Sequence, residues 1–178
     1  MYKFEEFVPI LIEGKFDLPF DLMFKFAKNN YLNKSRFKTI TASSCNALNW
    51  PRDPGVYVIR EICSKKNQVI YIGMTGKISK EGTLSGKQTL FNRKSRWNPY
   101  RFDKKNNEFQ YGPLYEKNES KNSAPKQGYE KSINIDQIEI DCFIFERNEK
   151  LAPTFLESLL LQCYVLQYEK LPPANNSF

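Results

Sequence analysis

Tyr57, Tyr71, Arg93 and Glu157 are the side chains whose types and order could together carry a reaction. Hydrolysis of a phosphodiester needs a base for the attacking water, a cation for the charge that develops on phosphate, and help for the leaving oxygen. The chain contains no histidine, so the base must be a tyrosine, a lysine or a carboxylate. A tyrosine phenol has a pKa of about 10 and is a poor base unless nearby cations lower that value.

These residue types predict a division of labour. We expect Tyr57 to act as the general base and Tyr71 to hydrogen-bond the water or the phosphate. The guanidinium of Arg93 suits a forked contact to phosphate oxygens. Glu157 is expected to hold one Mg²⁺, for which Mn²⁺ would substitute, because this hard ion binds one or two carboxylates plus phosphate oxygens and waters. The absence of histidine excludes histidine-based triads and histidine-ligated zinc.

The positive charge of the chain is concentrated in one segment. The whole chain carries 27 Lys and Arg against 20 Asp and Glu, a net charge of +7. Residues 77–105 contain nine basic and two acidic residues, so this window accounts for the whole excess. A localised basic segment indicates a polyanionic partner, and a solvated lysine-rich surface is the alternative. Lys77, Lys87 and Arg96 are the candidates for contacts to a nucleic-acid backbone.

The expected elements place these residues on a small α+β domain. After a Pro- and Gly-containing turn at 51–55, residues 55–62 and 69–73 read as a β-hairpin that carries both tyrosines, although the pattern leaves open whether they share a face. A short basic helix is expected over 89–97. The alternating segment 135–145 predicts a third strand, and 153–169 predicts a strong helix that ends before two prolines. The fold expected is a three-stranded, mainly antiparallel sheet flanked by helices.

Two further segments complete the predicted organisation. Residues 1–50 read as a mostly helical N-terminal extension that would contact DNA or a second subunit, and 51–178 as the main domain. Residues 103–134, which are polar and show no period, are expected to be a long insert. Its amide and aromatic side chains suit base reading, and a linker is the equal alternative.

In this order the chain resembles the GIY-YIG nuclease family. The motif reads Gly55-Val56-Tyr57, then Tyr71-Ile72-Gly73, followed by Leu90-Phe91-Asn92-Arg93. Phe155 to Leu160 matches the helix that carries the family's metal-binding glutamate, and Pro172-Pro173-Ala174-Asn175 matches its Pro-x-x-Asn element. The resemblance spans roughly residues 51–178 and is greatest to the small type II restriction endonucleases. It implies that Asn175 is a further catalytic-site residue.

Some positions depart from the family pattern. Trp97 stands four residues after Arg93, where many members have His or Tyr, and Tyr100 is a nearby substitute. Met74 follows the second motif in place of a frequent Lys. The spacing from Glu157 to Asn175 is long, which leaves Asn176 as a rival. Trp97, Tyr100 and Arg101 are included as expected DNA contacts because they belong to the same basic segment.

Glu157 has a purely structural interpretation as well. Thr154-Phe155-Leu156-Glu157 matches a capping box, which would account for a glutamate there. On a helical wheel, however, Glu157 is flanked by leucines and Tyr164, and a carboxylate on an apolar side needs a partner such as a metal.

Several competing functions remain. Glu119-Ser120-Lys121 matches the Glu-x-Lys tripeptide of another restriction-nuclease site, but it lies in the polar insert without a strand. The sequence also leaves open a non-cleaving DNA-binding accessory protein, a structure-specific repair nuclease and an RNA substrate. The expected partner is double-stranded DNA, cut by a two-fold homodimer if the site is palindromic.

The cysteines and the hydropathy bear on location. None of the four cysteines forms a Cys-x-x-Cys pair, and no apolar run approaches the ~20 residues that a membrane span needs. We therefore expect a cytoplasmic protein without membrane contacts.

Overall fold

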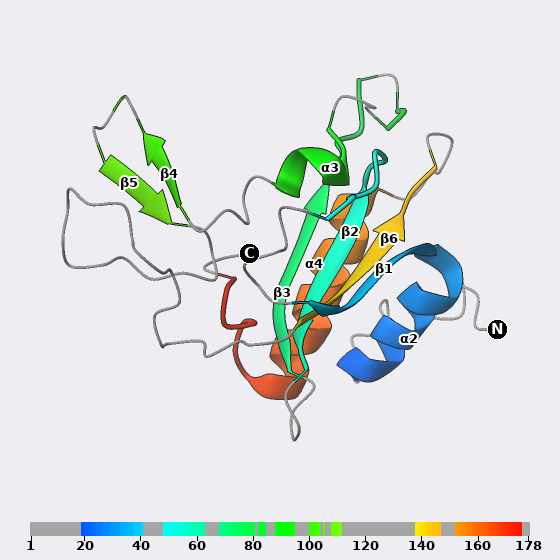
Figure 1. Ribbon diagram of the computed structural model, residues 1–178. Helices are drawn as coiled ribbons and strands as arrows, with labels where there is room; N and C mark the ends of the chain where they lie inside the picture. The colour runs from blue at the N-terminus through cyan, green and yellow to red at the C-terminus, as the bar shows by residue number, and fades with distance from the viewer. Residues whose placement is uncertain are drawn as a thin grey trace.

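The computed structural model forms an α+β fold (Figure 1). The expected sites at Lys87, Arg96 and Trp97, the rival Asn176 and the tripeptide 119–121 lie outside the described part of the chain. The structure describes residues 19–40, 48–62, 68–80, 82–84, 88–94, 100–103, 105, 108–111, 138–146 and 152–175.

The main sheet is antiparallel and has four strands in the order β1-β6-β2-β3. The three predicted strands are confirmed as β2 (Gly55–Glu61), β3 (Val69–Thr75) and β6 (Ile138–Ile144). The fourth, β1 (Leu32–Ile40), comes from the segment predicted to be a mostly helical extension, and it pairs with β6. The prediction of three strands and a separate extension was therefore wrong at β1, because lysines and asparagine between the apolar residues obscure the strand period there.

Two helices cover one face of this sheet. α2 (Phe20–Tyr31) and α4 (Pro153–Tyr168) pack on each other and on the inward side chains of the strands, such as Val58 and Phe143. α4 begins at a proline, whose fixed φ suits the first helical turn, and ends where Glu169 adopts a left-handed conformation with φ 57°. Figure 1 shows α4 running behind β2 and β3, with α2 at the side of the sheet.

The opposite face carries the tyrosines. Tyr57 and Tyr71 share a second apolar cluster with Trp50, with Leu90 of α3 (Leu90–Arg93) and with Ala174 near the end of the chain. The period of two along a strand separates the two clusters: Val56 and Val58 face α2 and α4, while Tyr57 and Ile59 face α3. Of the predicted basic helix over 89–97, residues 90–93 form one helical turn, and 95–97 lie outside the described part of the chain.

Acidic residues of β6 are buried under α2. Glu139 and Asp141, which alternate with Ile138, Ile140 and Cys142, are 7% and 0% exposed. Arg60 of β2 donates to Glu139 and, at 3.0 Å, to Asp141, and Lys28 of α2 lies 3.8 Å from the same Asp141 oxygen. Both faces of the sheet are covered, so the acidic side chains of β6 are buried and are compensated by a network of ion pairs.

A separate two-stranded sheet lies within the region expected to lead into the polar insert. β4 (Tyr100–Asp103) pairs antiparallel with β5 (Glu108–Tyr111), with Tyr100 opposite Tyr111. Figure 1 shows this hairpin standing apart from the main sheet. The expectation of an insert without regular structure was wrong for 103 and 108–111, and residues 112–134 lie outside the described part of the chain.

Candidate functional site

The hydroxyls of the two tyrosines converge over Gly73. Tyr57 of β2 lies directly opposite Gly73 of β3, and Tyr71 lies two residues before it on the same face. A Cβ built at Gly73 would be 3.0 Å from the hydroxyl oxygen of Tyr57 and 2.9 Å from that of Tyr71. The ring centroids are 5.6 Å apart. The question left open by the sequence is settled: the hairpin register places both phenols on one face, and a side chain at Gly73 would displace them.

Trp50 covers this pair. Its ring meets that of Tyr57 edge-on, with centroids 5.2 Å apart and an interplanar angle of 84°. Trp50 and Tyr57 are each 1% exposed, and Tyr71 is 5% exposed. The phenol pair is therefore closed to bulk solvent in this conformation.

Arg93 ends the short helix on the tyrosine face. The first two amides of α3 are held by the turn before β2, because Leu90 N–H donates to the carbonyl of Asp53 at 2.9 Å and Phe91 N–H to that of Pro51 at 2.7 Å. Leu90 is fully buried in the tyrosine cluster, while Arg93 is only partly buried. The structure thus places α3, which ends at Arg93, on the face of the sheet that carries the tyrosines.

That end of the sheet also receives the start of α4. A Cβ at Gly76, which follows β3, would contact both Pro54 and Pro153. Lys77, one of the predicted DNA contacts, is exposed directly after Gly76. The turn before β2, the end of β3 and the first turn of α4 therefore meet at one place.

Glu157 lies on α4, across the sheet from the phenols. It is four residues after Pro153, which contacts the end of β3, and seven before Tyr164, whose hydroxyl donates to the Val69 carbonyl at the start of β3. Seven residues are close to two helical turns, so Glu157 belongs to the stripe of α4 that runs along β3. The structure does not gather Glu157 into the cluster of Tyr57 and Tyr71.

The capping-box interpretation of Glu157 was wrong. The N-cap of α4 is Ala152, no side chain caps the helix, and Thr154 already lies inside the first turn. Proline at the first helical position starts the helix two residues earlier than the capping motif requires. Glu157 is partly buried beside Leu156 and Leu160, which are 1% and 0% exposed.

Asn175 binds the backbone of the second tyrosine motif. Its side-chain oxygen accepts from the Ile72 N–H at 3.0 Å and its amide nitrogen donates to the Ile72 carbonyl at 2.8 Å. Ala174 N–H donates to the Ile70 carbonyl at 3.0 Å. Asn175 therefore continues the ladder along the outer edge of β3 and acts on the site through the position of Tyr71 and Gly73.

Of the remaining residues predicted to contact DNA, Tyr100, Arg101 and Lys77 lie in the described part of the chain. Tyr100 and Arg101 lie in β4, where Arg101 pairs in register with Gln110. Lys77 is exposed at the tyrosine end of the main sheet.

Sequence reasoning missed Trp50. It directly precedes the turn at 51–55, and an aromatic residue before a turn that feeds a tyrosine-bearing strand is the signal that could have identified it. The contact itself depends on how residue 50 folds back onto β2, which sequence spacing does not give.

Neither a scan of protein-family models nor searches of curated proteins and solved structures found a match to this chain. Within the described residues, no three metal-ligating side chains form a group, and no helix has the length and apolarity to cross a bilayer.

Proposed function

We propose that the chain is a Mg²⁺-dependent DNA endonuclease of the GIY-YIG type, and most specifically a sequence-specific type II restriction enzyme. The observation that carries this proposal is the convergence of the Tyr57 and Tyr71 hydroxyls over Gly73, on the face where α3 presents Arg93. Two phenols and a guanidinium at the end of a covered sheet supply a base and a phosphate clamp without histidine.

In the proposed mechanism, Tyr57 takes the proton of the attacking water. Tyr71, whose ring lies 5.6 Å from that of Tyr57, orients the water or a phosphate oxygen. Arg93 binds phosphate oxygens and stabilises the negative charge that grows on them in the transition state. Asn175 acts as a positioning residue, since it fixes Ile72 between Tyr71 and Gly73.

A magnesium ion would be held by Glu157 together with phosphate oxygens of the substrate and waters. One carboxylate suits this ion, which binds phosphate substrates through one or two carboxylates and retains several waters. Glu157 is partly buried among leucines and is not accounted for by helix capping. The ion would supply charge neutralisation at the phosphate.

Cleavage requires that the substrate opens the cover over the phenols. Tyr57 is 1% exposed and its ring contacts that of Trp50, so we expect the indole to move when water reaches the phenol. Trp50 emission, isolated in a Trp97→Phe background, should shift to longer wavelength when the protein binds DNA. An unchanged spectrum at saturating DNA in a cleaving enzyme would refute this opening.

The burial of the phenols also favours a second candidate function. A DNA-binding accessory protein on the same scaffold needs no solvent-accessible base. Glu157 lies on α4, whose buried leucines belong to the cluster across the sheet from the tyrosines. Such a protein would bind DNA with steep salt dependence and leave it intact.

The test is cleavage of plasmid and phage-length DNA with Mg²⁺, with and without EDTA. Tyr57→Phe and Glu157→Gln should each reduce the cleavage rate by about 10²-fold or more, in line with loss of a general base or a metal ligand. Tyr168→Phe and Glu169→Gln are matched controls, because both residues are exposed at the far end of α4. Discrete bands that vanish with EDTA support a restriction enzyme, a smear supports a nonspecific or structure-specific nuclease, and binding without cleavage supports the accessory protein.

A further inference from the structure

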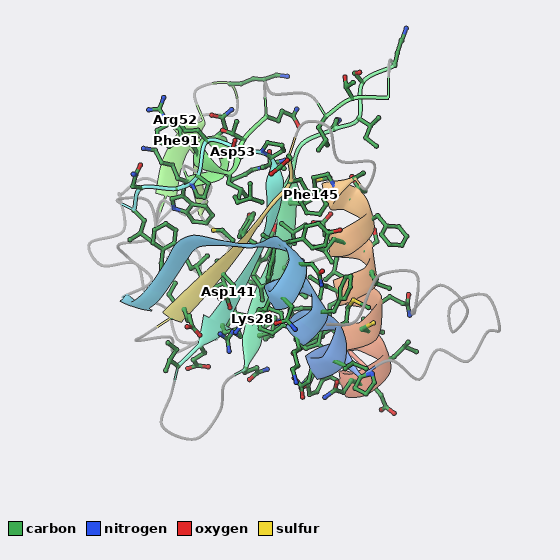
Figure 2. All side chains as sticks on the ribbon, turned by 90° about the vertical axis from the view of Figure 1, so that its right-hand side faces the viewer. Lys28, Arg52, Asp53, Phe91, Asp141 and Phe145 are labelled. Atoms are coloured by element: carbon green, nitrogen blue, oxygen red, sulfur yellow. The ribbon has the colours of Figure 1, made fainter. Side chains whose placement is uncertain are left out.

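Two cations share one aromatic ring beside the candidate site. The guanidinium carbon of Arg52 lies 4.9 Å from the centroid of Phe91, and the Lys94 ammonium lies 4.0 Å from the same centroid. Both distances are within the range of cation–π attraction. Arg52 lies in the turn before β2, Phe91 lies in α3, and Lys94 is the C-cap of α3. The three residues therefore join two segments that are far apart in the sequence. Figure 2 shows Arg52 next to Phe91.

The backbone holds this group rigidly. The carbonyls on either side of Arg52, those of Pro51 and Asp53, accept the amides of Phe91 and Leu90. The turn and the helix are therefore one unit, and the position of Arg52 relative to Lys94 is set by main-chain hydrogen bonds as well as by the ring.

The cations of the group form no ion pair in the described part of the chain: no carboxylate there is paired with Arg52, Arg93 or Lys94. Two cations close to one ring repel each other, and an anion that contacts both would offset this repulsion.

The group also lies on the face of the phenols. Leu90, adjacent to Phe91, is buried in the cluster of Tyr57 and Tyr71, and Phe91 packs against that cluster. A strand of nucleic acid that contacts Arg52 and Lys94 would continue towards Arg93 and the tyrosine pair.

From these observations we propose that Arg52 and Lys94, positioned by the ring of Phe91, form a contact to the phosphate backbone of double-stranded DNA. This inference rests on the proposed function for the identity of the polyanion. Arg52 and Lys94 would position the duplex but would not contribute to sequence recognition, because contacts to phosphates do not distinguish one base from another.

The test measures equilibrium binding of a fluorescein-labelled DNA duplex by anisotropy, in EDTA, over a range of salt from about 50 to 200 mM. Each of Arg52→Gln and Lys94→Gln should reduce the slope of log K against log salt by about 0.9, and the double variant by about 1.8. Phe91→Leu should weaken binding but keep the slope, since both charges remain. The matched control is Lys25→Gln, because Lys25 is exposed on α2, across the sheet from α3. This variant should change neither the affinity nor the salt slope.

A wild-type slope in the double variant, an equal change in Lys25→Gln, or no DNA binding by the wild-type protein would each overturn the inference. The two proposals fail separately because binding is measured in EDTA. If the double variant has a reduced salt slope but the wild-type protein does not cleave DNA in Mg²⁺, the endonuclease proposal fails and the phosphate contact stands. If the wild-type protein cleaves DNA but the salt slope is the same in the double variant, the phosphate contact fails and the endonuclease proposal stands.

Discussion

Tyr57 and Tyr71 come from different strands, yet their hydroxyl oxygens lie 3.0 and 2.9 Å from one point, the place where Gly73 would carry a Cβ. Gly73, the glycine of the second motif, is thus required because any larger residue would collide with the two phenols. At Gly55, in the first motif, a Cβ would collide with the Phe143 carbonyl, so there the glycine permits close approach of β2 and β6.

Gly73→Ala should therefore push both tyrosines from their positions. We expect a loss of about 1–3 kcal/mol in the free energy of unfolding from overpacking, and DNA cleavage reduced by at least as much as in Tyr57→Phe. Gly82→Ala is the control: Gly82 has φ +76° with no atom near its Cβ position, so the change strains the backbone only. Urea unfolding and cleavage assays check both, and a fully active Gly73→Ala would contradict the assigned geometry.

Asn175→Ala should destabilise the edge of β3. The substitution leaves the N–H and carbonyl of Ile72 without their side-chain partners, which costs about 1–3 kcal/mol in total if water does not replace them. Asn175→Asp should also be destabilised, because a carboxylate cannot donate to the Ile72 carbonyl. A larger loss of stability in Asn176→Ala, the rival position, than in Asn175→Ala would reverse the assignment.

The buried ion network predicts unequal effects for its two cations. Arg60 bonds both carboxylates and its side chain is 14% exposed, whereas that of Lys28 is 25% exposed and lies 3.8 Å from Asp141. Arg60→Met should cost about 3–5 kcal/mol, since it leaves buried carboxylates poorly compensated. Lys28→Met should cost about 0–1 kcal/mol. Chemical denaturation measures both, and equal losses would contradict the larger role assigned to Arg60.

The Cys163 thiol predicts a pH dependence. Burial raises its pKa from 9.0 to about 11, because the interior disfavours the thiolate. Below pH 9 the thiol is protonated in both states. Between about pH 9 and pH 11 the unfolded chain loses this proton first, so stability falls by about 1.4 kcal/mol per pH unit from this group.

This loss is isolated by comparing wild type with Cys163→Ala. The variant should start less stable, because a cavity replaces the sulfur, and the difference between the two proteins should shrink above pH 9. Parallel stability curves from pH 8 to 11 would exclude a raised pKa at Cys163.

The sequence predicted the elements that have strong periods and clear ends. The hairpin of Tyr57 and Tyr71 and the helix that stops before Pro172 follow from alternation and from proline, which are local rules. β1 was missed because its strand character depends on pairing with β6, more than ninety residues away. The alternation of β6 predicted the strand, but the burial of Glu139 and Asp141 depends on their contacts with Arg60 and Lys28, which the sequence does not reveal.

The candidate site was also predicted only in part, because some of its contacts are local and others depend on tertiary folding. Residue types and order singled out Tyr57, Tyr71 and Arg93. The sheet register does bring the two tyrosines to one face, and α3, which ends at Arg93, packs on that face through Leu90. The cover by Trp50, the bonds of Asn175 to Ile72 and the pairing of Arg52 with Phe91 depend on loops folding back, which no spacing encodes.

The bonds from Ala174 and Asn175 to β3 also bear on assembly. An outermost strand with free amides and carbonyls is a template on which a second molecule can add a strand, whether in a dimer or in an aggregate. Ile70 and Ile72 already have partners along that side, so another chain could pair with β3 there only after displacing residues 174 and 175. A short stretch of the chain's own backbone and one amide side chain thus give β3 the protection of an interior strand.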